Sequence, residues 1–324
     1  MTLLLLATLV LPYEGKYADD ARLAAAVKEL PAQLAAARKL VGEKTAVRIR
    51  LVDGGKARGG VVARTRREPE GFVITLYTEA LVLRAHAPIS TLAHELIHVR
   101  QKSRWSAREA ARRPPWVVEG MAIYLAGQLE QRARVLAAHV GRERVPADAV
   151  SRLVNGLEGR HTLLDYFEDG AAFAHVEEQH GKEKVDAFIE ALLAGQRART
   201  AVRSVLGQRW ESFERGAREH AIRTIRPLIE NGRPALLGRR RALLEERWDD
   251  ALEGTAPNTV YDADFVYVRA RALAGLGRPQ EALQTLRRQF LDQPVREATI
   301  LATALRFEAK LEPALAARLK LDLP

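Results

Sequence analysis

The residues best suited to chemistry lie in one short segment, His94-Glu95-Leu96-Ile97-His98. If the segment is helical, His94 and His98 share one face and can present two imidazole nitrogens to a single ion. Glu95 then lies about 100° around the helix, beside the ion, where a general base for a metal-bound water belongs. The alternative interpretation is a helix that carries two structural histidines.

A second motif begins downstream of His98 and reads Trp116-Val-Val-Glu119-Gly120-Met-Ala122-Ile-Tyr124. The chain contains no cysteine, so any bound metal must be held by His, Asp or Glu. Two His and one Glu leave a tetrahedral zinc ion with one open position for water, which a catalytic site needs and a structural site lacks.

Taken together, the two motifs resemble the gluzincin metallopeptidases, in particular the peptidase MA-like family related to the aminopeptidase N group. The resemblance implies one Zn²⁺ per chain, bound by His94, His98 and Glu119, with Glu95 activating the zinc-bound water. In the related enzymes a downstream Tyr often stabilises the oxyanion, and Tyr166 occupies a similar place in this chain. The alternative for Tyr166 is a side chain that only packs.

These motifs predict a zinc-dependent peptidase that hydrolyses a peptide or protein substrate. Aminopeptidase N relatives recognise a free amino terminus through a Gly-x-Met-x-Asn element, and none precedes the His-Glu motif here, so we expect an endopeptidase. The alternative is a catalytically silent zincin-like protein that acts as a protein-interaction module through a C-terminal helical repeat.

The elements that must position these residues change in character near residue 86. Residues 17–42 have helical spacing interrupted by Pro31, which predicts a kinked helix or two short ones. Residues 45–51 and 71–78 are predicted strands, and the resemblance places the second of them at the edge of the cleft, where a substrate backbone would pair. Further on, Ser90 is a predicted N-cap and Pro115 can open the next helix.

The predicted fold is α+β, with a zincin-like catalytic domain over residues 1–230 and a small all-α domain over residues 231–324. Residues 1–85 form the strand-and-helix part of the first domain, and residues 86–230 form its helical, metal-binding part. The second domain is tetratricopeptide-like and could bind a protein partner. Its signature residues are Ala270, Leu273, Gly277, Ala282, Leu286 and Pro294.

The 324 residues carry a net charge of +10, but no nucleic-acid-binding motif accompanies that charge, so we do not expect nucleic acid as a partner. Residues 100–113 form a basic stretch between the two motifs, typical of a solvated face, although it could favour acidic substrates. Residues 1–12 fit a buried first strand better than a signal segment. Neither this segment nor any other apolar run is long enough to span a membrane, so we expect a soluble protein, cytoplasmic rather than exported.

Overall fold

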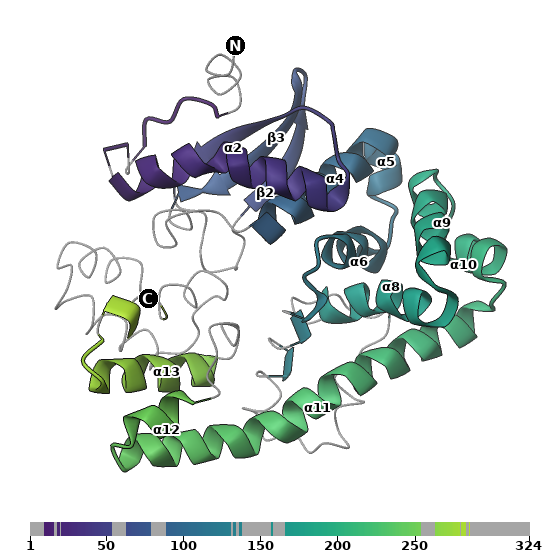
Figure 1. Cartoon of the computed structure of the whole chain (residues 1–324). Helices are drawn as coiled ribbons and strands as arrows, with labels where there is room; N and C mark the ends of the chain where they lie inside the picture. Colours follow the sequence, from purple (N-terminus) through teal and green to yellow (C-terminus); the bar gives the residue numbers. More distant parts are fainter. Residues whose placement is uncertain are drawn as a thin grey trace.

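The computed structural model describes residues 10–15, 18–19, 21–53, 63–78, 89–130, 132–133, 136–137, 157, 166–253, 263–278, 280–282 and 285. Within these residues, three strands form one small sheet and the other elements are helices, which confirms the predicted α+β class. The sheet lies at one end of the molecule behind α2 (Ala21–Val41), and the long helix α11 (Trp210–Leu244) runs along the opposite side (Figure 1).

The sheet has the order β1-β3-β2, formed by Val47–Val52, Gly71–Tyr77 and Ala63–Glu68 respectively. β3 pairs in parallel with β1 and antiparallel with β2. The prediction that residues 71–78 form the edge strand is therefore wrong, because β3 is the middle strand of the described sheet. Val73 and Ile74 are both fully buried, and burial on both faces is typical of a central strand.

Strand β2 takes the edge position instead, and its side chains alternate between buried and exposed. Ala63 and Thr65 point inward, whereas Arg64 and Arg66 are exposed. Among the described residues no further strand pairs with the outer side of β2, and its inward-facing Thr65 contacts helix α4 (Ile89–Arg104).

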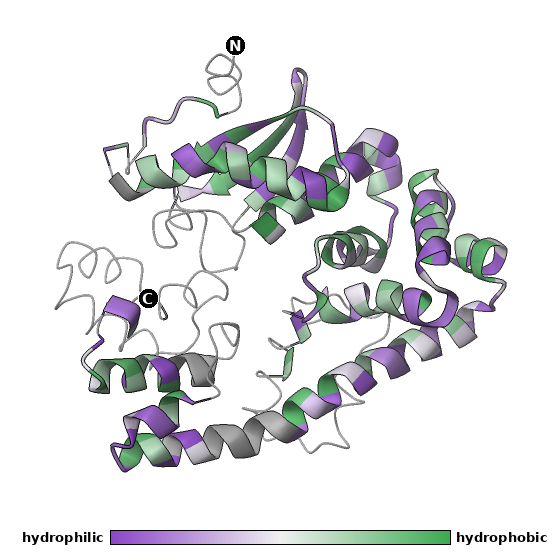
Figure 2. Ribbon diagram, viewed as in Figure 1, coloured by the Kyte–Doolittle hydropathy of each residue, from purple (hydrophilic) through white to green (hydrophobic). Residues whose placement is uncertain are grey.

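Helix α2 (Ala21–Val41) packs against α4 as part of the main core. Hydrophobic and hydrophilic residues alternate along it (Figure 2), and its buried positions recur every three or four residues, as in an amphipathic helix. The helix is continuous through Pro31, so Pro31 does not divide it. The buried positions are Leu23, Ala26, Leu30, Leu34, Ala37 and Val41.

The two motif helices are α4 (Ile89–Arg104) and α6 (Pro115–Leu125), joined through the short α5 (Ala107–Ala110). α4 already begins at Ile89, so Ser90 lies inside its first turn and the predicted N-cap is wrong. α6 begins at Pro115 as predicted, because the first helical turn does not need the amide proton that proline lacks.

Helix α8 (Tyr166–His180) packs closely against α6, and glycines permit the approach. A Cβ atom on Gly120 would lie 2.2 Å from the carbonyl oxygen of Asp169, and one on Gly170 would lie 2.7 Å from Cγ2 of Ile123. The glycine after Glu119 in the second motif is therefore required by helix packing.

Helices α9 (Lys182–Leu193), α10 (Ala198–Leu206) and α11 (Trp210–Leu244) complete the helical part. Gly181, Gly195 and Gly207 lie at the ends of helices, and all three have positive φ angles. Rings from α6, α8, α9 and α11 pack together with centroid separations of 5.5–6.1 Å. These rings belong to Trp116, Phe173, Phe188, Trp210 and Phe213.

Helix α11 runs without interruption across the predicted domain boundary at residues 230–231. Near its C-terminal end it packs against α12 (Trp248–Leu252) and α13 (Ala263–Gly275), where Gly275 lies against the ring of Trp248. This end has its own small buried cluster, which includes Ala242 and Val268. The division into two domains and the helical repeat stay predictions, and Leu286 and Pro294 lie outside the described residues.

The predicted first strand falls mainly on residues 1–9, which also lie outside the described residues. Val10, the next residue, forms an isolated parallel bridge with Ile49 of β1. None of the described helices combines the length and the apolar character needed to cross a membrane.

Candidate metal centre

Three potential ligand atoms converge where α4 and α6 meet. Nε2 of His94 lies 3.0 Å from Nε2 of His98, and Oε2 of Glu119 lies 3.3 Å and 3.6 Å from these two nitrogens. All three side chains are largely shielded from solvent, and their ligand atoms form a compact triangle. The structure thus brings together the three residues that the sequence motifs single out as metal ligands.

Two glutamines determine which imidazole nitrogens face this triangle. Nδ1 of His98 lies 2.8 Å from Oε1 of Gln101, and Nδ1 of His94 lies 3.1 Å from Oε1 of Gln128. Each glutamine also donates from Nε2 to a backbone carbonyl, Gln101 to Val118 at 2.8 Å and Gln128 to Ser90 at 3.0 Å.

Because both amide nitrogens already donate to carbonyls, the amide oxygens must face the imidazoles as acceptors. Each Nδ1 is then the protonated nitrogen, and each Nε2 carries a lone pair directed at the triangle. Such outer hydrogen bonds orient the histidines of metal sites and fix their tautomers. Two lone pairs only 3.0 Å apart repel each other unless a cation or proton lies between them.

The residues present fit zinc. A tetrahedral zinc ion with nitrogen and oxygen ligands at about 2.0–2.1 Å has ligand atoms roughly 3.3 Å apart, and the observed edges of 3.0, 3.3 and 3.6 Å bracket this value. Imidazole nitrogens combined with one carboxylate also match the ligand preference of zinc better than that of calcium or magnesium.

Proton affinities within the triangle are strongly perturbed. Burial lowers the pKa of His94, so its imidazole tends to be neutral. Burial opposes the protonation of His98 as well, but the adjoining Glu119 carboxylate outweighs that effect and raises the pKa of His98. Burial alone would raise the pKa of Glu119, yet the two adjoining imidazoles, which donate hydrogen bonds to its carboxylate when they are protonated, hold that pKa far below its usual value. Glu119 is therefore an anion at any physiological pH.

Glu95 lies beside the triangle and is not part of it. Glu95 as a residue is only 6% exposed, and its Oε2 lies 2.7 Å from the hydroxyl of Thr65 on the edge strand β2. The same hydroxyl lies 3.0 Å from the backbone carbonyl of Glu95. Thr65 thus links β2 to α4 and holds the carboxylate in one orientation.

A cavity of about 520 Å³ opens over these residues. This volume lies in the range of small-molecule and peptide sites, roughly 300–1,000 Å³. Ala63, Arg64 and Thr65 of β2 form one side of the cavity, and Tyr166 at the start of α8 contributes to another. The edge strand that borders the site is therefore β2, whereas the sequence analysis assigned that role to residues 71–78.

Tyr166 lies in the same cavity as the triangle, as the sequence analysis anticipated, and its ring is half-buried. The guanidinium of Arg132 lies 5.3 Å from the centre of the ring. Burial, together with the nearby Glu119 carboxylate, raises the pKa of Tyr166 to about 12, so its phenol stays protonated at neutral pH. Tyr124 does not line the cavity and donates a hydrogen bond to Glu177 at 2.7 Å.

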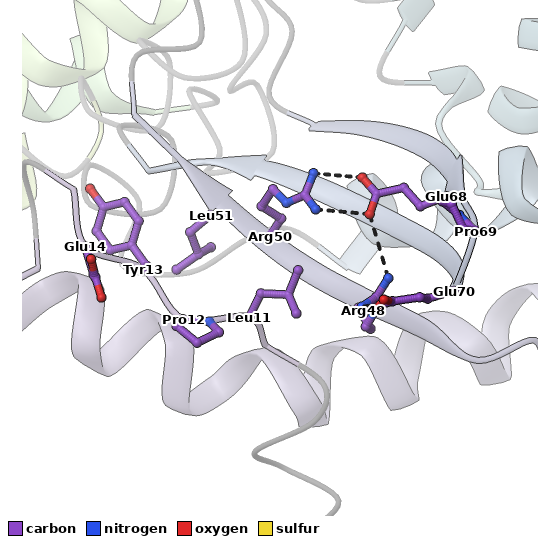
Figure 3. Close-up of a pocket in the computed structure, with 10 residues that line it drawn as sticks. All are labelled: Leu11, Pro12, Tyr13, Glu14, Arg48, Arg50, Leu51, Glu68, Pro69 and Glu70. Carbon is purple, nitrogen blue, oxygen red and sulfur yellow. Dashed lines mark hydrogen bonds and ion pairs between the residues drawn. The ribbon is translucent and has the colours of Figure 1, made fainter.

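A second hollow, of about 590 Å³, lies between the N-terminal segment and β1 (Figure 3). Four of its five charged residues pair with one another, since Arg50 donates to both carboxylate oxygens of Glu68, at 2.8 and 3.0 Å, and Arg48 contacts Glu70. This hollow is lined by neither histidine nor any of the motif residues, and it is therefore not a candidate for the metal centre.

Comparison of the chain with family models, with characterised proteins and with solved structures finds no match. The class of the protein therefore rests on its fold and site alone, as an α+β protein with a candidate His₂Glu metal centre.

Three residues of this centre were missed by the sequence analysis, namely Thr65, Gln101 and Gln128. Gln101 follows His98 by three residues and so lies on the same helical face, a spacing that could have indicated its role. Thr65 and Gln128 come from other elements, and no local pattern connects them to α4.

Proposed function

We propose that this chain is a zinc-dependent peptidase of the gluzincin type. The observation that carries the proposal is the triangle of His94, His98 and Glu119, in which both imidazoles are held by glutamines with their Nε2 lone pairs directed inward. A structural zinc site usually has four protein ligands, whereas three ligands beside a cavity are typical of catalytic sites.

Zinc, when bound, would polarise the scissile carbonyl and make water acidic enough to attack near neutral pH. Glu95 would accept the proton from the attacking water, and its position in the lining of the cavity beside the triangle supports this role. After the attack, Glu95 would pass that proton to the leaving amine. Its hydrogen bond from Thr65 keeps one carboxylate oxygen occupied and leaves the other to handle the proton.

Tyr166 would supply a hydrogen bond to the oxyanion that develops as the carbonyl is attacked. This role requires a protonated phenol at working pH, and the raised pKa of Tyr166 satisfies that condition.

Strand β2 offers a place for the substrate backbone. It borders the cavity and has no partner strand on its outer side among the described residues, so an extended peptide could pair with it. The charged residues that line the cavity, other than Glu95 and Glu119, are all basic: Arg64, Lys102 and Arg132. We therefore expect peptides rich in Asp and Glu to be cleaved faster than peptides rich in Lys and Arg.

The decisive experiment measures metal content by mass spectrometry in protein purified without added metal, alongside His98→Ala and Glu95→Gln. We expect near-stoichiometric zinc in the wild type and in Glu95→Gln, and a clear loss in His98→Ala. A peptide library would then be screened with Glu95→Gln as the inactive control. A wild-type protein that takes up no more zinc than His98→Ala after reconstitution would refute the peptidase proposal.

A further inference from the structure

A second group of metal-binding side chains lies where α8 packs against α11, two helices that run side by side (Figure 1). His175 and Glu178 come from α8, and His220 comes from α11. Each offers one ligand atom, and these atoms all lie within 4.8 Å of one another. None of the three is among the described residues that line the catalytic cavity.

The sequence places these side chains together through helical spacing and one glycine. His175 and Glu178 are three residues apart and share a face of α8. Gly216 lies one turn before His220 on α11, and a Cβ atom there would lie only 2.5 Å from Nε2 of His175. The absence of a side chain at Gly216 therefore allows the His175 ring to lie directly against α11, next to His220.

His175 is the least satisfied member of the group. His175 is only 8% exposed, and its Nδ1 atom is buried without a hydrogen-bond partner among the described residues. Buried imidazole nitrogens are normally hydrogen bonded or bound to a metal. The two other members are close together, with Nδ1 of His220 2.9 Å from Oε2 of Glu178.

A cation already contacts this group. Arg223, one turn after His220, donates from Nη2 to Oε2 of Glu178, and the same nitrogen lies 3.4 Å from Nδ1 of His220. The Arg223 side chain is 59% exposed, so it can move into solvent without disturbing the core. The group therefore attracts positive charge and can exchange its arginine for another cation.

We propose that His175, Glu178 and His220 form a second transition-metal site, with Zn²⁺ as the best-matched ion, and that Arg223 competes with the metal for Glu178. Two imidazoles and one carboxylate are a donor set suited to zinc and poorly suited to magnesium or calcium. A metal bound here would link α8 to α11 and so stabilise α8, the helix that begins at Tyr166. It does not depend on the proposed peptidase activity.

The test is a zinc titration of the full-length protein, with bound metal measured by mass spectrometry after dialysis at a fixed free-zinc concentration. We expect two equivalents in the wild type, one in Glu178→Gln, one in His98→Ala, and none in the double variant. Glu178→Gln preserves side-chain shape at a half-exposed position, so the fold should be retained, and circular dichroism checks this.

His180→Ala is the matched control, because His180 is on the same helix, pairs with Gln208 and lies outside the group. This variant should bind as much zinc as the wild type. Arg223→Gln should bind the second equivalent at least roughly fivefold more tightly, because a positive charge next to the metal is removed.

Equal zinc uptake by the wild type and Glu178→Gln, or weaker binding by Arg223→Gln, would overturn the second site. A failure of the first site would look different, because His98→Ala would then match the wild type while Glu178→Gln still lost one equivalent.

Discussion

Gly120→Ala is the sharpest test of how packing positions the metal centre, because it adds one methyl group next to a ligand. The added Cβ would lie 2.2 Å from the carbonyl oxygen of Asp169 and 2.5 Å from its carbonyl carbon. Both are backbone atoms of α8, so no side chain can rotate away. To reach an ordinary contact distance of 3.4 Å, α6 and α8 would have to separate locally by 1.2 Å.

The energetic consequence follows from two opposing effects. Overpacking of a well-packed interior costs about 1–3 kcal/mol, and the better helix propensity of Ala returns roughly 0.5–1 kcal/mol. We therefore expect a net loss of about 1–2 kcal/mol and a fall in Tm of roughly 2–8 °C. Because Glu119 directly precedes Gly120, the shift also misplaces a ligand, and zinc affinity should fall about tenfold or more.

Thermal denaturation followed by circular dichroism gives the stability, and competition with a chromogenic chelator gives the zinc affinity. Gly238→Ala is the matched control: it lies within α11, and a Cβ there would contact nothing within 4 Å. This control should be as stable as the wild type or slightly more stable, with unchanged zinc affinity. The packing argument is refuted if Gly120→Ala melts no lower than Gly238→Ala and binds zinc equally well.

Three further predictions concern the site itself. Gln128→Leu removes the acceptor for the His94 N–H, so zinc affinity should fall about 10- to 100-fold in a chelator competition; wild-type affinity would exclude the orienting role. Tyr166→Phe should lower kcat about 10²- to 10³-fold with unchanged zinc content, and full turnover would show that Tyr166 only packs. Since the pKa of Tyr166 is raised to about 12, its ionisation should cause no loss of wild-type activity between pH 8 and pH 10 in a pH–rate profile. Zinc affinity should weaken as pH falls, because bound imidazoles must be deprotonated, and the raised pKa of His98 starts this weakening at a higher pH than for an ordinary histidine. Glu119→Gln removes the carboxylate that raises the pKa of His98, so zinc should bind more weakly overall. The pH at which half of the zinc is released should nevertheless be lower than in the wild type. An unchanged half-release pH would show that Glu119 does not raise the pKa of His98.

Local patterns predicted much of the secondary structure. The alternation in residues 45–51 and the proline at the start of α6 are both short-range signals, and the structure bears them out with strand β1 and helix α6. Strand β2 was missed because four of its six residues are charged, and its burial alternates only through Ala63 and Thr65. A small inward side chain and a threonine are weak hydrophobic signals, so periodicity did not reveal this strand.

The long helix α11 shows a similar limit. Pro227, Pro234 and the Asn231-Gly232 pair lie close to the predicted boundary at residues 230–231, yet the chain stays helical from Trp210 to Leu244. Helix-breaking propensity is a local cost of a few kcal/mol, and packing along the rest of a helix can outweigh it.

By itself, the sequence determined the ligand types and their local geometry. Spacing on a helix places His94 and His98 on one face and Glu95 beside it, and this depends only on the helical repeat. Tertiary structure decided everything that joins separate elements. The approach of α6 to α4 brings Glu119 to the two histidines, the position of β2 brings Thr65 to Glu95, and the turn after α6 brings Gln128 to His94. The proximity of His175 to His220 likewise depends on Gly216, whose missing side chain lets the His175 ring lie against α11. Such contacts arise from the packing of surfaces far apart in the chain, and no local repeat in the sequence encodes them.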